Sequence, residues 1–250
     1  MKNLIEKRVR RLVGKAICEY NLLQEGDRVL VGISGGKDSL SMLKILAERE
    51  KIAPIKYELF PLLVDLGFGP LPEEELKAFV ESLGLKLLIK RTDIGPKSHN
   101  SSLRETPCFL CSRMRRKVLF ETASELGCNK IALGHNKDDL LVTFFLNVLY
   151  SGEISTMVPK QELFKGKLTI IRPLCLVDEE KVEAFSRLHN LPVIHDPCPT
   201  RGHTRRAQIK TWLHQIFKKD PHTKGNAFHA LSNVNLEYLI PKTNGRKKCP

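Results

Sequence analysis

The hydrophobic residues of this chain follow two alternating spacings. Short apolar runs, typical of buried parallel strands, are separated by segments in which apolar side chains recur every three or four residues, as on one face of a helix. This alternation predicts right-handed βαβ units, and hence an α/β fold whose parallel sheet carries helices on both faces. The runs are residues 29–33, 57–64, 86–89, 130–133 and 168–171, and the helical segments are 39–48, 73–83, 109–126, 138–150 and 178–189.

The pattern changes toward both ends of the chain. Residues 1–22 place apolar side chains on one face and basic ones largely off it, which predicts an amphipathic helix. The Gly-, Pro- and Ser-containing stretch 92–107 predicts a long loop. The last part predicts two helices that separate near Asp220-Pro221, followed by a polar tail. We therefore expect an N-terminal helix (1–24), an α/β domain with a cysteine site (25–200), and a C-terminal helical segment with a polar tail (201–250).

A polar turn with two glycines follows the first apolar run, and a helical segment follows the turn. It reads Ser34, Gly35, Gly36, Lys37, Asp38 and Ser39. The glycines let backbone N–H groups converge, the helix dipole adds partial positive charge, and the hydroxyls and the ammonium add donors. The turn lacks the spacing of a Walker loop and of the GxGxxG fingerprint. It is similar to the PP-loop of the ATP pyrophosphatase superfamily, which implies ATP as substrate and cleavage between its α and β phosphates.

Other polar residues follow neighbouring strands of the expected sheet. Gly134, His135, Asp138 and Asp139 come after the run 130–133, and Asp65 ends the run 57–64. Ligands of parallel sheets lie at the carboxyl ends of the strands, so we expect these groups near the glycine turn. Asp65 would border the adenosine. His135 would contact the nucleotide or serve as a hydrogen-bonded structural residue.

The chain contains seven cysteines, an odd number that argues against a secreted disulfide framework. Cys108 and Cys111 form a CxxC at the start of a predicted helix, a position that favours thiolate. Cys198 is the other well-placed candidate, whereas Cys18, Cys128 and Cys175 are expected to pack in apolar surroundings. The pair alone is compatible with redox chemistry, a zinc site, an iron–sulfur site or simple packing. His195 or Asp196 is an alternative fourth ligand that would close a zinc site.

Composition narrows the class of protein. Hydrophobic residues make up 42% of the chain, no run is long and apolar enough to span a bilayer, and the N-terminus lacks a signal-peptide pattern. We therefore expect a cytoplasmic protein without a membrane partner. The net charge of +13 indicates a polyanionic partner, and basic residues cluster beside Cys111 and Cys198. This placement favours RNA that reaches the cysteine site.

Three motifs in order carry a more specific resemblance. They are residues 108–116 (Cys-Phe-Leu-Cys-Ser-Arg-Met-Arg-Arg), 132–139 (Ala-Leu-Gly-His-Asn-Lys-Asp-Asp) and 171–174 (Ile-Arg-Pro-Leu). Over roughly residues 25–240 the chain resembles the tRNA 2-thiocytidine synthetase family, a branch of the PP-loop tRNA thiolases. The resemblance implies a [4Fe-4S] cluster on Cys108, Cys111 and Cys198. The string around Cys198 differs from that of the best-known members, and the N-terminal zinc-finger cysteines of related 2-thiouridine enzymes are missing.

The resemblance implies adenylation of a pyrimidine carbonyl, of an anticodon-loop cytidine above all, followed by sulfur transfer. Asp38 would help to hold Mg²⁺, with helix-dipole stabilisation as its alternative role. Asp138 would bind metal, orient the base or cap a helix, and Arg115, one turn after Cys111, would contact phosphate or the activated oxygen. Expected partners are tRNA, a sulfur donor (a cysteine desulfurase system or sulfide) and a second copy in a homodimer.

Other functions remain open from the sequence. A 2-thiouridine synthase would use the same machinery, and a tRNA lysidine synthetase would share the glycine turn but would not need the CxxC. A zinc-stabilised RNA-binding module without catalysis is the third alternative.

Overall fold

The computed structural model describes residues 2–100, 106–194, 197–200, 202 and 204–240. Within these residues the strands form one sheet of six strands in the order β3-β2-β1-β4-β6-β5. Their bounds are β1 Asp27–Ile33, β2 Tyr57–Asp65, β3 Leu88–Arg91, β4 Lys130–Ala132, β5 Lys160–Leu163 and β6 Leu168–Ile171. All neighbouring pairs are parallel except β5 with β6. The expected α/β fold is confirmed.

Strand β1 lies in the middle of the sheet because its side chains can be buried on both faces. Val29, Leu30 and Val31 are fully buried, as expected for a central parallel strand. β1 pairs with β2 on one side and with β4 on the other. The order of the strands reverses between β1 and β4, so the crevice at their carboxyl ends is the place where such sheets bind ligands.

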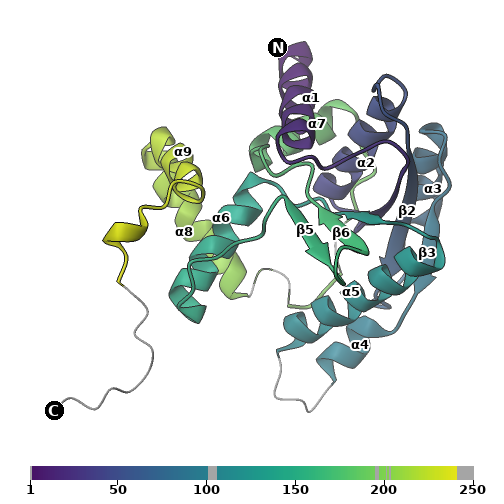
Figure 1. Cartoon of the computed structure of the whole chain (residues 1–250). Coiled ribbons are helices and arrows are strands. Elements are labelled where there is room, and N and C mark those ends of the chain that lie inside the picture. Colours follow the sequence, from purple (N-terminus) through teal and green to yellow (C-terminus); the bar gives the residue numbers. More distant parts are fainter. Residues whose placement is uncertain (1, 101–105, 195–196, 201, 203, 241–250) are drawn as a thin grey trace.

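The helices form two layers and one separate group. Their bounds are α1 Lys2–Glu19, α2 Lys37–Glu50, α3 Glu73–Ser82, α4 Ile94–His99, α5 Pro107–Glu125, α6 Lys137–Leu146, α7 Glu179–Leu188, α8 Arg205–Lys219 and α9 Pro221–Ala230. Side chains of α1, α2, α3 and α7 share one core cluster, and α4 and α5 supply another. A third cluster joins α6, α8 and α9, which stand to one side of the sheet (Figure 1). The C-terminal helices therefore reach the α/β domain through α6 and through ion pairs of Lys210 with Glu179 and of Lys224 with Asp178.

The stretch 92–107 is not the continuous loop that its composition predicts. Residues 94–99 form helix α4, in which Ile94, Gly95 and Ser98 are buried. Pro96 lies in the first turn of this helix, where a missing N–H costs little. A Cβ at position 95 would lie 2.7 Å from the carbonyl oxygen of Leu66, so the glycine permits the close approach. Tertiary packing therefore overrides the loop signal.

The structure departs from the expected elements at three further places. β5 was missed because it is a polar edge strand, antiparallel to β6, with exposed residues at its centre. The long helix expected over 138–150 ends at Leu146, and a π-helical turn, Asn147–Ser151, follows it. The strand expected at 86–89 begins at Leu88 instead.

Candidate active site

The glycine turn joins β1 to α2 and leaves the start of the helix open. Gly35 adopts φ +76°, which side-chain-bearing residues rarely do, and Gly36 is the N-cap of α2. Within the described residues, no side chain caps the first N–H groups of this helix. These donors and the helix dipole together form an anion site of the kind that binds phosphate.

Two serines hold the turn in shape. The Ser34 N–H donates to Ser39 Oγ at 3.2 Å, and the Gly36 N–H donates to Ser34 Oγ at 3.3 Å. Ser39 Oγ in turn donates to the Gly36 carbonyl at 2.9 Å. The hydroxyls therefore support the turn, in addition to any role as ligands.

Gly134 brings the end of β4 against the start of α2. A Cβ there would lie 2.9 Å from the Ser39 nitrogen and 3.0 Å from its Cα, a distance that side chains do not adopt. The next polar side chain, Asn136, donates from Nδ2 to Asp38 Oδ1 at 2.9 Å. The two strand ends therefore meet at Asp38, as their positions in the sequence predict.

Lys37 and Asp38 form the charged centre of the turn. Lys37 Nζ lies 3.0 Å from Asp38 Oδ2 and 2.8 Å from Glu179 Oε1, on α7. Burial alone would lower the pKa of Lys37, but the two carboxylates outweigh it and raise that pKa. Burial raises the pKa of Asp38 despite the opposing effects of Lys37 and Asn136. Lys37 is therefore a permanent cation here.

Asp138 and Asp139 have different surroundings. Asp139 completes a capping box with Asn136 at the start of α6 and pairs with Arg206 of α8. Asp138 accepts from the Glu179 N–H at 2.7 Å and pairs with Lys224 of α9 at 2.6 Å. Asp138, which was expected to be functional, is thus linked to α7 and α9, whereas Asp139 caps α6.

His135 is a neutral hydrogen-bond acceptor. Its Nδ1 accepts from Arg172 Nε at 3.3 Å. Burial lowers the pKa of His135 to about 4, and nearby arginines, including Arg115 and Arg172, act in the same direction against an opposing effect of Asp139. His135 therefore has the hydrogen-bond partner within the protein that its alternative, structural role requires.

The three predicted cluster ligands come together from two distant parts of the chain. Thr200 Oγ1 lies 3.2 Å from Cys198 Sγ and 3.4 Å from Cys108 Sγ. Cys111 is close enough to both other thiols to be affected electrostatically. Cys108 is exposed, whereas Cys111 and Cys198 are half-buried. Position at a helix start does not favour thiolate at Cys111, because burial raises its pKa more than Arg115 lowers it.

The geometry bears on which metal centre these thiols fit. Among the described residues, no three His, Cys, Asp or Glu side chains are close enough to hold one metal ion. Ligands of one zinc ion must all lie about 2.3 Å from it, whereas thiolates of a cluster bind different irons and stand further apart. Cys108, Cys111 and Cys198 supply the three thiols that the expected cluster requires. The alternative zinc ligands His195 and Asp196 lie outside the described residues.

The cysteine site and the glycine turn lie close together. The Ile194 N–H donates to the Gly35 carbonyl at 2.9 Å, and the Ile194 side chain packs over Gly35. Cys198 follows four residues later, and four residues of chain span at most about 14 Å. Arg115 acts electrostatically on Cys111, in the cysteine site, and on His135, which follows β4 near the glycine turn. The two sites therefore share one region of the molecule.

The remaining residues considered in the sequence have other partners or surroundings. The Asp65 carboxylate ends β2 and accepts from the Gly67 N–H at 2.9 Å, so it stabilises its own turn. Cys128 and Cys175 are buried as expected, but Cys18 is exposed on α1, so its assignment as a packing residue was wrong. In the described residues, no helix is long and apolar enough to cross a membrane.

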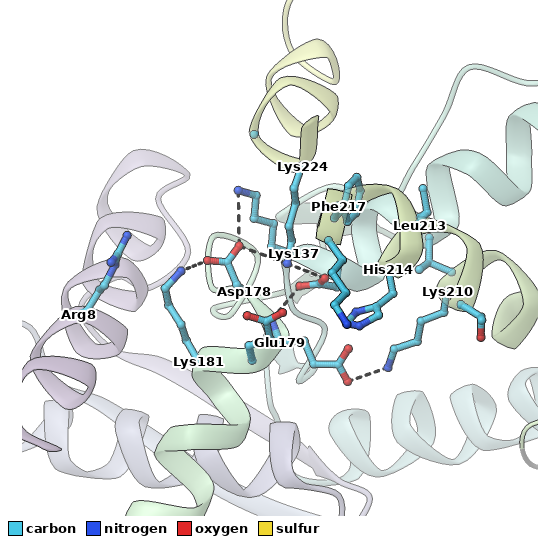
Figure 2. A pocket seen from close by; sticks show the side chains of 16 residues that line it. Arg8, Lys137, Asp178, Glu179, Lys181, Lys210, Leu213, His214, Phe217 and Lys224 are labelled. Carbon is cyan, nitrogen blue, oxygen red and sulfur yellow. Dashed lines mark hydrogen bonds and ion pairs between the residues drawn. The ribbon is translucent and has the colours of Figure 1, made fainter. Parts of the chain in front are cut away.

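A cavity of about 910 Å³ lies beside the turn, between α6, α7, α8 and α9 (Figure 2). Its charged lining includes Asp178, Glu179, Lys210 and Lys224, none of which the sequence predicted as a nucleotide-binding or metal-binding residue. Acidic residues at a helix start are normally attributed to the dipole, and basic residues on the surface to solubility. Thr200 was missed for a similar reason, since a single hydroxyl in an irregular segment gives no signal.

Comparisons with known proteins place the chain in a family. Residues 1–217 match the family model of the PP-loop domain. The chain is 39% identical over 243 residues to the tRNA-cytidine(32) 2-sulfurtransferase of Ectopseudomonas mendocina, covering 96% of this chain and 89% of that protein. It is 39% identical over 238 residues to the enzyme of the same name from Syntrophotalea carbinolica, covering 94% and 92%.

A solved structure shares the fold. The U34-tRNA thiolase NcsA from Methanococcus maripaludis, determined with its [4Fe-4S] cluster, matches with a TM-score of 0.76 and 24% identity. The match covers 98% of this chain and 83% of that one. The glycine turn, the motif order and these relatives lead to one assignment: the chain belongs to the PP-loop family, among the tRNA-cytidine 2-sulfurtransferases.

Proposed function

We propose that this protein replaces the 2-oxygen of a tRNA cytidine by sulfur in an ATP-dependent reaction. Relatives at 39% identity are named for cytidine 32, which makes that anticodon-loop base the first candidate. The observation that carries the proposal is the short connection between two sites: Ile194 contacts the glycine turn, and Cys198 lies four residues further along.

The first step uses the glycine turn. The cytidine 2-oxygen attacks the α-phosphorus of ATP, the bond to the bridging oxygen breaks, and pyrophosphate leaves. The open N–H groups of α2 and the ammonium of Lys37 stabilise the charge that develops on the leaving group. Asp38 is the proposed ligand of Mg²⁺, oriented by Asn136.

The second step uses the cysteine site. Sulfide attacks C2 of the activated base, the C2–O bond breaks, and AMP leaves with the oxygen, so no net redox change is needed. Cys108, Cys111 and Cys198 would hold a [4Fe-4S] cluster, and a cluster with only three protein ligands would offer sulfide a place to bind. Arg115 lies near Cys111 and is proposed to bind phosphate or the departing oxygen. Asp138 is proposed to orient the base.

The remaining partners are proposals as well. A cysteine desulfurase system or free sulfide would deliver the sulfur, the chain would act as a homodimer, and the reaction would take place in the cytoplasm, where tRNA is modified.

Reconstitution tests the proposal. Protein purified without oxygen is incubated with unmodified tRNA, ATP, Mg²⁺ and sulfide, and digested nucleosides are analysed by mass spectrometry, with AMP and pyrophosphate measured in parallel. We expect 2-thiocytidine and brown absorption in the wild type. Both should be lost in Cys108→Ser and kept in the matched variant Cys18→Ser, whose thiol is exposed on α1.

The outcomes distinguish the alternatives. 2-Thiouridine would correct the choice of base, and a lysine-dependent product would indicate a lysidine synthetase. A colourless zinc protein that releases no pyrophosphate would refute the proposal and leave an RNA-binding module.

A further inference from the structure

Two lysines from different helices share one carboxylate oxygen beside the glycine turn. Glu179 Oε1 lies 2.8 Å from Lys37 Nζ and 2.7 Å from Lys210 Nζ. Figure 2 shows the contact between Glu179, on α7, and Lys210, on α8. Two ammonium groups so close to one atom repel each other, so the arrangement requires an anion between them.

The surroundings contain more positive than negative groups. Within the described residues, five lysines form ion pairs with four carboxylates in this network. They are Lys37, Lys137, Lys181, Lys210 and Lys224, paired with Asp38, Asp138, Asp178 and Glu179. Arg8, Lys218 and one further carboxylate, Glu180, also line the cavity, so positive groups remain in excess. A further anion can therefore bind without an additional cation.

There is also room for such a ligand. Glu179 and Lys210 line the cavity of about 910 Å³ and a second one of about 190 Å³, which also contains Arg206. The Lys210 side chain is 54% exposed, so a change of partner costs little desolvation. Phosphate accepts from several donors at once on separate oxygens, whereas Glu179 serves both lysines with the single oxygen Oε1.

We propose that Lys210 is a second phosphate-binding residue: a phosphate oxygen takes the place of Glu179 Oε1 between Lys37 and Lys210. The ligand class is the diphosphate portion of a nucleotide or inorganic pyrophosphate. The inference rests on the proposed function for the identity of the nucleotide. Glu179 then holds both lysines in position until the anion arrives.

A purely structural ion bridge between α7 and α8 predicts a different result. In that case, loss of either partner lowers stability, and removal of Glu179 does not improve anion binding. If phosphate displaces the carboxylate, Lys210→Met weakens the anion, and Glu179→Gln, which removes the competing charge, strengthens it.

Calorimetric titration of the full chain with pyrophosphate, and separately with AMP, distinguishes a structural ion bridge from displacement of the carboxylate by phosphate. We expect pyrophosphate to bind about tenfold more weakly to Lys210→Met and several-fold more tightly to Glu179→Gln. Lys210→Arg should remain near the wild type, and Lys219→Met, exposed on the same helix, is the control. AMP affinity should change little in Lys210→Met.

Equal pyrophosphate affinity in Lys210→Met and the wild type would overturn the inference, as would an absence of pyrophosphate binding in the wild type. If Lys210→Met does not fold, Lys210→Gln takes its place, with thermal unfolding as the check. A wild type that binds pyrophosphate through Lys210 but forms no thiolated nucleoside would refute only the proposed function.

Discussion

At the scale of residues, the site is made by close contacts that leave little freedom of substitution. Gly134 lies against the Ser39 backbone, and Asn136 connects α6 to Asp38. The position of the glycine after a strand indicated a role near the turn, but not the reason for it. The reason is the close approach of the Gly134 backbone to the Ser39 backbone, which is visible only in the folded chain.

Gly134→Ala should therefore be costly. Its Cβ would meet backbone atoms that cannot turn aside, so we expect a loss of about 1–3 kcal/mol in the free energy of unfolding and weaker ATP binding. Denaturant titration and nucleotide titration measure the two effects. Gly225→Ala is the control, because a Cβ there meets nothing and alanine favours the helix. Equal behaviour of the two variants would contradict the argument.

His135 should make stability sensitive to acid. The pKa of His135 is lowered to about 4 in the folded protein, so this contribution is present above about pH 6.5 and is lost as the pH falls toward 4. At pH 5 the loss is about 2 kcal/mol, from about 1.4 kcal/mol for each unit of pKa. His135→Gln, which keeps an acceptor, should lose less between pH 7.5 and 5 in urea unfolding. Parallel pH profiles would show that another group is responsible.

At the scale of elements, apolar periodicity was sufficient to predict each helix or strand whose own apolar face is buried in the core. The central strands and α2, α5 and α7 lie close to their predicted positions because their apolar faces form the core. α4 and β5 were missed because contacts elsewhere stabilise them: α4 packs under Leu66 and Phe68, and β5 pairs at the sheet edge. The spacing of apolar residues indicates which faces are buried, but it does not indicate such contacts between distant parts of the chain.

Helix α6 connects capping with chemistry through Asn136. Asn136→Asp keeps a good N-cap but places a second carboxylate beside Asp38, whose pKa is already raised by burial. We expect at least a tenfold loss of adenylation together with a loss of stability, because position 136 is buried and the new carboxylate cannot donate to Asp38, whereas Asn136→Ala loses about 1–2 kcal/mol of stability through the missing cap. Pyrophosphate release and thermal unfolding measure these effects. Asp220→Ala, at the cap of α9, should affect stability alone.

At the scale of the whole molecule, the sequence indicated two candidate sites, the glycine turn and the cysteine site, but not the contact that connects them. The glycine turn and the CxxC are both visible as motifs, because each depends on a few adjacent residues. The link between them is the contact of Ile194 with Gly35, four residues before Cys198, and Thr200 then joins Cys198 to Cys108 of the CxxC. Only the convergence of strand ends in a parallel sheet was predictable from general rules.

The net charge of +13 predicts strong dependence of tRNA binding on salt. Released counterions drive such binding, so affinity should fall on the order of 1,000-fold between about 50 and 200 mM salt. Fluorescence anisotropy with labelled tRNA measures this change. A salt-independent affinity would show that the basic surface does not contact the RNA backbone.

The stretch after α7 has a consequence for how this protein tolerates change. Ile194 contacts Gly35, Thr200 contacts two thiols, and Arg206 pairs with Asp139, all within a short length of chain. The described residues of this stretch therefore connect the glycine turn, the cysteine site and α6. An inserted residue in this stretch would shift every later contact. The length of the stretch should therefore be as restricted as its composition.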